Sequence, residues 1–171
     1  MTEIKRWAGL YRVLEDGIEI ATEAWTREVG PDQIRLTSVV NGTDEYQYEE
    51  EIEITLDPDW RPLQVMIERE SAEGERHYVG RRVGSAWISQ LFRESGPMRT
   101  ATLEFDADTH VDYLTAHTNS VTLHRLALAP EHGQEVSVVS IDPDTFIPSL
   151  VHLKYDRLAD PEPFDIEGYQ A

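Results

Sequence analysis

A strict two-residue alternation between residues 45 and 56 constrains the fold of this chain more than any other feature. The segment reads EYQYEEEIEITL, and apart from Glu50 its even positions hold tyrosine, isoleucine or leucine, while its odd positions hold polar residues. Successive side chains of a β-strand point to opposite faces of the sheet. The segment is therefore predicted to be a strand with one buried face and one solvated face.

Shorter runs of the same alternation recur along the chain and are rich in β-branched and aromatic residues. They occupy residues 17–25, 33–40, 62–68, 85–92, 100–105, 135–141 and 149–155. Turn-forming sequences such as Asn41-Gly42 and Gly96-Pro97 separate them. Many short strands joined by tight turns are typical of an all-β, mainly antiparallel fold, and we expect a strongly curved β-roll or half-barrel of roughly 8–10 strands.

The chain is predicted to be a single β-roll domain over residues 1–171, since this length suits one core. Residues 54–65 and 139–151 both read as a strand, an Asp-Pro-Asp turn and a proline-led strand. This repeat suggests two related half-sheets, although Asp-Pro-Asp is also a favourable turn in its own right. Residues 160–171 are expected to form a frayed acidic tail.

Residues 106–128 lack clear alternation. We expect them to begin as a loop with one short helix over 111–116 and then to return into a strand.

The acidic charge excludes several classes of partner. Asp and Glu number 33 against 15 Lys and Arg, which gives a formal net charge of −18. Nucleic acid is excluded as a partner because its recognition requires a basic surface, and anionic membrane surfaces are disfavoured for the same reason. The chain has no cysteine and no apolar stretch long enough to span a bilayer. We therefore expect no transmembrane segment and a cytoplasmic location.

Motifs for cofactors and metals are absent from the sequence. There is no glycine-rich phosphate loop, no G-x-S-x-G elbow and no H-E-x-x-H pair. His110, His117 and His124 recur every seven residues, but seven residues of helix rise about 10 Å, whereas zinc holds each imidazole nitrogen at about 2 Å. We predict no cofactor and no metal site.

Glu50 is an unusual carboxylate because the alternation places it on the same face as Tyr48 and Ile52. A carboxylate on an apolar face must be neutralised, paired or exposed to a wet cavity. Two interpretations stay open: an arginine partner or local bulge accommodates Glu50, or the concave face holds a partly solvated pocket that Glu50 helps to line.

Several segments between residues 45 and 158 resemble the bacterial family of "putative glycolipid-binding" proteins. The matching residues are Asp57, Trp60, Arg61, Asp106, Thr118, Asn119, Leu123, Arg125, Leu126 and Tyr155. The resemblance implies a curved antiparallel sheet comparable with bacterial lipoprotein-carrier folds, and a role in binding lipid or glycolipid.

The favoured hypothesis is therefore noncatalytic binding of a lipid, glycolipid or similar amphipathic small molecule on the concave apolar face. By the resemblance, Arg61, Asn119, His124 and Arg125 would contact a head group, and Trp60 and Tyr155 would flank it. On the second interpretation of the alternation, Glu50 would line the pocket. Two alternatives remain: an enzyme acting on a lipid-like substrate with Glu50 or His124 as general base, or a protein-interaction module with an acidic surface. The sequence determines neither the ligand nor the oligomeric state.

Overall fold

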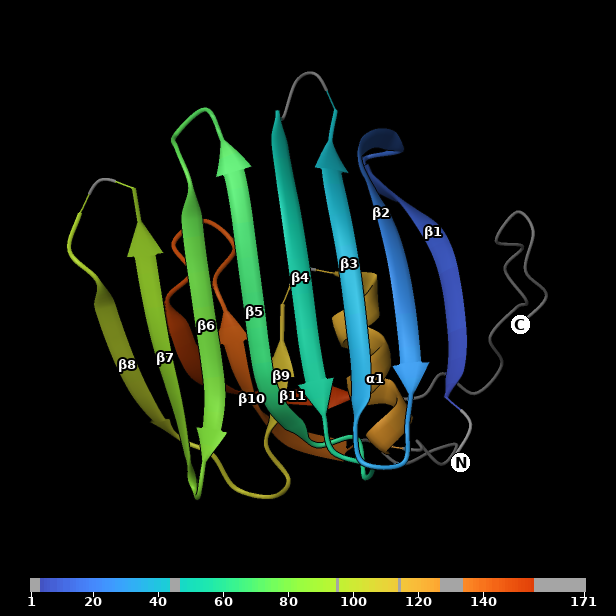
Figure 1. Ribbon diagram of the computed structural model, residues 1–171, viewed down its shortest axis with the longest axis vertical. Coiled ribbons are helices and arrows are strands. Elements are labelled where there is room, and N and C mark those ends of the chain that lie inside the picture. Colours follow the sequence, from blue (N-terminus) through green and yellow to red (C-terminus); the bar gives the residue numbers. More distant parts are fainter. Residues whose placement is uncertain (1–3, 44–46, 95, 114, 127–133, 156–171) are drawn as a thin grey trace.

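An open antiparallel sheet of eight strands dominates the fold. The structure, a computed structural model, describes residues 4–43, 47–94, 96–113, 115–126 and 134–155. The strands follow one another across the sheet in chain order, each antiparallel to the next (Figure 1). They are β1 (Lys5–Glu15), β2 (Ile18–Val29), β3 (Ile34–Gly42), β4 (Tyr48–Leu56), β5 (Pro62–Ser71), β6 (Arg76–Val83), β7 (Ala86–Arg93) and β8 (Arg99–Glu104).

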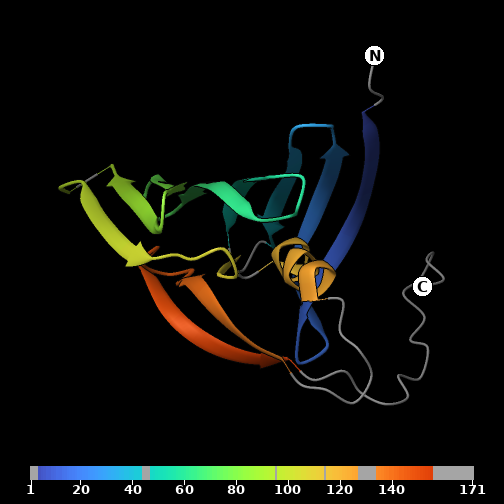
Figure 2. The ribbon, with the colours of Figure 1, turned by 90° about the horizontal axis from the view of Figure 1, so that it is seen from below.

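A second, smaller sheet and one helix lie in the hollow of the large sheet (Figure 2). The small sheet contains β9 (His110–Asp112), β10 (Gln134–Ile141) and β11 (Pro148–Tyr155), and the helix is α1 (Ala116–Leu126). β10 pairs antiparallel with β11 and parallel with β9. The predicted fold class is confirmed: the chain is mostly antiparallel β, with a curved sheet that is not closed and, among the described residues, one short helix.

The predicted position of the helix was wrong. Val111 belongs to β9, and α1 begins only at Ala116 and runs through the stretch that was expected to return to a strand. The side-chain hydroxyl of Thr115 accepts the backbone N–H of Thr118 at 3.2 Å, which caps the helix. Serine, threonine and histidine favour a helix only weakly, so packing of this segment decides its structure. Within the described residues no helix is long and apolar enough to cross a membrane.

The strand alternation is explained by the core. Ile52, Ile54 and Leu56 of β4 are all buried on the face that meets the helix and the small sheet. Burial of each such side chain stabilises the fold by about 1.5–3 kcal/mol. The largest core residue, Trp87, lies across Gly80 of the neighbouring strand, where an added Cβ would come within 2.5 Å of the indole. Gly80 is therefore needed for this packing.

Three arginines fasten the small sheet to the large one. Arg69 of β5 donates to the carbonyl oxygen of Pro143 at 2.7 Å, and Arg93 of β7 donates to that of Thr145 at 3.1 Å. Arg76 of β6 donates to the carbonyl oxygen between them, that of Asp144. Arginines on three adjacent strands thus hold three consecutive carbonyl groups of the β10–β11 turn, and we call this set the arginine clasp.

The two Asp-Pro-Asp segments form similar turns in different sheets. The Asp57 carboxylate accepts two backbone N–H groups in the β4–β5 turn, and the Asp142 carboxylate does the same in the β10–β11 turn. Each turn also holds an aromatic residue at positive φ, Trp60 at 63° and Phe146 at 57°. The origin of these turns as two related half-sheets stays a prediction. The expected tail, 160–171, lies outside the described residues.

Candidate functional site

Glu50 has an arginine partner. The Nε of Arg69 donates to the Glu50 carboxylate at 2.6 Å, and the hydroxyl of Tyr113 donates to the same oxygen at 2.6 Å. Burial raises the pKa of Glu50, and the charge of Arg69 and the Tyr113 hydrogen bond oppose that rise. Because Glu50 is only 3 % exposed, these contacts support the interpretation that it is a paired structural carboxylate.

A second buried carboxylate lies at the start of α1. Glu23 of β2 accepts the backbone N–H of Ala116 at 3.2 Å and the hydroxyl of Ser38 at 2.6 Å. A negative charge at a helix N-terminus is favourable, because the helix dipole is positive there. Burial nevertheless raises the pKa of Glu23. Glu23 therefore fixes the position of α1 on the concave face.

His117 extends this network. Its Nδ1 lies 3.3 Å from the Ser38 hydroxyl oxygen, and its ring packs on Trp25 with centroids 5.0 Å apart. Burial and the charge of Arg27 lower the pKa of His117 to about 4. In a Ser-His-acid triad the imidazole lies between the other two groups. Here Ser38 lies between Glu23 and His117, so the arrangement holds the helix and does not match a hydrolytic triad.

Four side chains form an aromatic and cationic group where α1 ends near the β4–β5 turn. Arg27 lies between two indoles, with its guanidinium carbon 4.5 Å from the Trp7 ring centroid and 5.8 Å from that of Trp60. His124 also packs on Trp60, and the centroids of the two rings are 3.9 Å apart. We call Trp7, Arg27, Trp60 and His124 the rim cluster. Trp7 is 41 % exposed, so the cluster is open to solvent.

The backbone fixes the rim cluster from three elements. Trp7 and Arg27 are directly opposite each other in the β1–β2 register. Trp60 adopts φ 63° at the β4–β5 turn, a conformation that costs a non-glycine residue about 1–2 kcal/mol. Bulky residues persist in such conformations where surrounding structure or function demands them. His124 lies in the last turn of α1, where the helix dipole favours a cation.

The structure brings together some of the predicted site residues and separates others. Trp60 and His124 are in contact. Arg61 forms an ion pair with Asp59 at 3.1 Å. Burial lowers the pKa of Arg125, and the nearby positive charge of Arg61 lowers it further. Arg125 donates to two backbone carbonyl groups of the loop before β9.

Three predicted site residues lie outside the rim cluster. Asn119 uses its amide to donate to the carbonyl oxygen of Thr115 on its own helix. Tyr155 ends β11 opposite Gln134. Glu50 belongs to the buried pair described above. Sequence reasoning missed Trp7 and Arg27, and the signal that could have found them is the β1–β2 register, which places both on the inward face.

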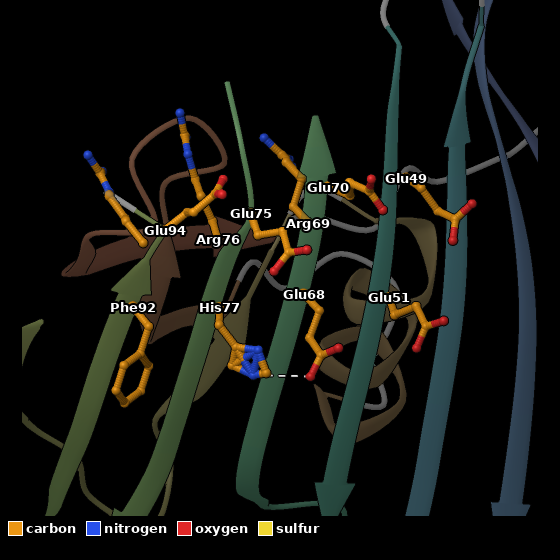
Figure 3. Close-up of a pocket in the computed structure, with 11 residues that line it drawn as sticks. Glu49, Glu51, Glu68, Arg69, Glu70, Glu75, Arg76, His77, Phe92 and Glu94 are labelled. Atoms are coloured by element: carbon orange, nitrogen blue, oxygen red, sulfur yellow. Dashed lines mark ion pairs between the residues drawn. The ribbon is translucent and has the colours of Figure 1, made fainter. Parts of the chain in front are cut away.

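A hollow of about 490 Å³ lies on the face of the sheet opposite α1 (Figure 3). Glu49 faces Glu70 and Glu51 faces Glu68 across β4 and β5, and like charges directly opposite each other destabilise a sheet. His77 pairs with Glu68 at 3.0 Å, with both side chains substantially exposed. Exposed pairs of this kind contribute little to stability. Within the described residues no group of three histidines and carboxylates could hold a metal ion.

Comparisons with known proteins assign the family. Residues 18–170 match the family described as "Putative glycolipid-binding". The chain belongs to this family. The family match covers more of the chain than residues 45–158, the part in which the sequence resembles the family. A crystal structure of a DUF1089 family protein from Pseudomonas aeruginosa is similar, with a TM-score of 0.58, 22% identity, and coverage of 96% of this chain and 85% of that one. This likeness shows the fold alone. No curated protein matches significantly.

Proposed function

We propose that the chain binds an amphipathic, sugar-bearing molecule of the glycolipid class at the rim cluster, without catalysing a reaction. The observation that carries this proposal is the pair of indoles, Trp7 and Trp60, that flank the guanidinium of Arg27 at an open end of the fold. An indole offers a large apolar face with a polar edge, which suits a ligand that combines apolar and polar surface.

Several features support binding at this place. Leu123, the residue before His124 on α1, is 48 % exposed and offers apolar surface on the same last turn of the helix. The αL conformation of Trp60 keeps a bulky ring in place at a backbone cost, which fits a functional requirement. The family description agrees with the ligand class.

Two observations favour binding over catalysis. Glu50, one proposed general base, is buried and already bonded to Arg69 and Tyr113. His124, the other, packs on Trp60 with the two rings tilted by 32°, and no carboxylate among the described residues pairs with it. A general base needs access to the proton that it removes, and Glu50 lacks that access.

The test is a titration of the protein with octyl β-glucoside below its critical micelle concentration. Calorimetry and intrinsic tryptophan fluorescence measure the binding. Trp7→Ser and Trp60→Ser are expected to weaken binding at least tenfold each. Leu150→Ser is the matched control, since Leu150 is an exposed apolar residue on β11, 38 % exposed, outside the cluster; its affinity should equal that of the wild type.

Native mass spectrometry of the purified protein, with lipid extraction of the same sample, provides an independent readout. A stoichiometric copurifying amphiphile supports the proposal. A protein that copurifies with nothing and takes up no octyl glucoside refutes it. Equal affinities of the two tryptophan variants and the wild type would instead refute the assignment of the rim cluster as the site.

A further inference from the structure

We infer that the ligand of the rim cluster carries an anionic oxygen group, such as a phosphate, that pairs with Arg27. This inference rests on the proposed function and adds the charge of the head group to it. Two neighbouring side chains on β2 have buried donors without hydrogen-bond partners among the described residues, and one of them, Arg27, lies between the indoles.

Arg27 lacks the partners that the other arginines of the concave face possess. Arg69 pairs with Glu50, Arg61 pairs with Asp59, and Arg125 donates to two backbone carbonyl groups. Within the described part of the chain no carboxylate pairs with Arg27, and its buried Nε has no hydrogen-bond partner. Its one described form of stabilisation is the contact of the guanidinium with the two indole faces.

A second unsatisfied donor lies two residues away on the same inward face of β2. The Nε1 of Trp25 is buried and also has no hydrogen-bond partner. The Trp25 ring lies across Gly9 of β1, where an added Cβ would come within 2.6 Å of it, and packs on His117. Of the four buried side-chain nitrogen or oxygen atoms that lack a partner among the described residues, two are therefore donors at neighbouring inward positions.

The chemistry of these donors selects the ligand. Arginine and the tryptophan indole donate hydrogen bonds and accept none, so they select an acceptor-rich group. Sugar hydroxyl groups both donate and accept, and a neutral acceptor would leave the positive charge of Arg27 unpaired. A partly buried charge is costly unless it is paired, and a charge-assisted bond to an anionic oxygen meets both needs.

The net charge of the chain affects how an anionic ligand can reach Arg27. At −18 the chain repels anions at long range. Arg27, which pairs with no carboxylate of the described residues, therefore acts at short range. It would bind an anion that the apolar part of the same ligand has already brought to the cluster. We therefore expect an anionic amphiphile to bind well and the same anion without its alkyl chain to bind poorly.

The experiment compares three probes by calorimetry: octyl β-glucoside, octyl β-glucoside 6-phosphate and glucose 6-phosphate. The two octyl compounds share the tail and the sugar and differ only in the phosphate. We expect the octyl phosphate to bind at least tenfold more tightly than octyl glucoside. Arg27→Met should abolish this difference, so that both octyl compounds bind the variant with equal affinity. Urea unfolding of Arg27→Met, monitored by circular dichroism, shows separately that the variant folds. Arg81→Gln, at an exposed position on β6, removes the same charge elsewhere and should preserve the difference.

The outcomes separate the inference from the proposed function. If both octyl compounds bind with equal affinity, the anionic head group is refuted and glycolipid binding stands. If neither binds, the proposed function itself fails. If glucose 6-phosphate binds as tightly as its octyl derivative, the anion site is supported, the source is a soluble sugar phosphate, and the amphipathic ligand is refuted. A tenfold preference that persists in Arg27→Met would refute the role of Arg27.

Discussion

Replacing Arg69 by methionine should be among the most damaging single substitutions in the described part of the chain. The Nε of Arg69 donates to the Glu50 carboxylate at 2.6 Å, and another guanidinium nitrogen donates to the Tyr113 hydroxyl at 3.0 Å. As part of the arginine clasp, Arg69 also donates to the carbonyl oxygen of Pro143. Methionine preserves most of the apolar volume but leaves the Glu50 carboxylate buried without its cation. Removing one partner of a buried ion pair costs about 3–5 kcal/mol.

A double-mutant cycle identifies the source of this loss. In Glu50→Gln the amide still offers an oxygen to Arg69, so we expect a smaller loss of about 1–3 kcal/mol. In the double variant Arg69→Met/Glu50→Gln no buried charge is stranded, and the total loss should be about 1–3 kcal/mol less than the sum of the single losses. A domain of this size has about 5–15 kcal/mol of stability in total, so Arg69→Met is expected to stay folded but weakened.

Urea unfolding at pH 7.5, monitored by circular dichroism and fluorescence, measures all four members of the cycle. Arg81→Met on the exposed face of β6 serves as the control and should change the free energy of unfolding by less than about 0.5 kcal/mol. If Arg69→Met loses less than about 1 kcal/mol, or if the single losses add without coupling, Glu50 is not held by Arg69 in the way described and this reasoning is wrong.

Two further predictions concern the αL turn and acid stability. Trp60→Gly should be more stable than Trp60→Ala by about 1 kcal/mol in urea unfolding, because both lose the ring and only glycine is relaxed at φ 63°; equal stabilities would show that the backbone is not strained. The pKa of His117 is about 4 in the folded state, below the usual 6.5, so its contribution to stability is present above pH 6.5 and is lost as the pH falls toward 4. Between pH 7.5 and pH 5 His117 accounts for a loss of about 2 kcal/mol. This part of the loss should be absent in His117→Gln, while the part due to His110, whose pKa burial also lowers to about 4, remains; an unchanged pH profile in His117→Gln would contradict the assignment.

The sheet was predictable from sequence because its signal is local. Alternation in β4 reports directly which side chains face the core, and Ile52, Ile54 and Leu56 are all buried as the pattern requires. The helix was misplaced because its signal is weak. Residues 116–126 contain few strong helix formers, and capping by Thr115 together with packing on Glu23 decides their structure.

The candidate site was predictable only in part, for a comparable reason. Trp60 and His124 came from the family resemblance, but their contact joins a turn to a helix end and is invisible in the sequence. Trp7 and Arg27 meet through the register of two strands near the N-terminus, outside the segment that carried the resemblance. That the Nε of Arg27 has no hydrogen-bond partner among the described residues is a property of three-dimensional packing alone.

The arginine clasp should resist acid better than the contacts that hold α1. Guanidinium groups stay protonated and carbonyl oxygens do not titrate, so the bonds from Arg69, Arg76 and Arg93 to the β10–β11 turn persist as the pH falls. The attachment of α1, in contrast, depends on Glu23 and His117, both of which change charge. Mild acid should therefore loosen the helix side of the concave face first while the small sheet remains docked, and hydrogen exchange would record this as earlier loss of protection in α1 than in β10.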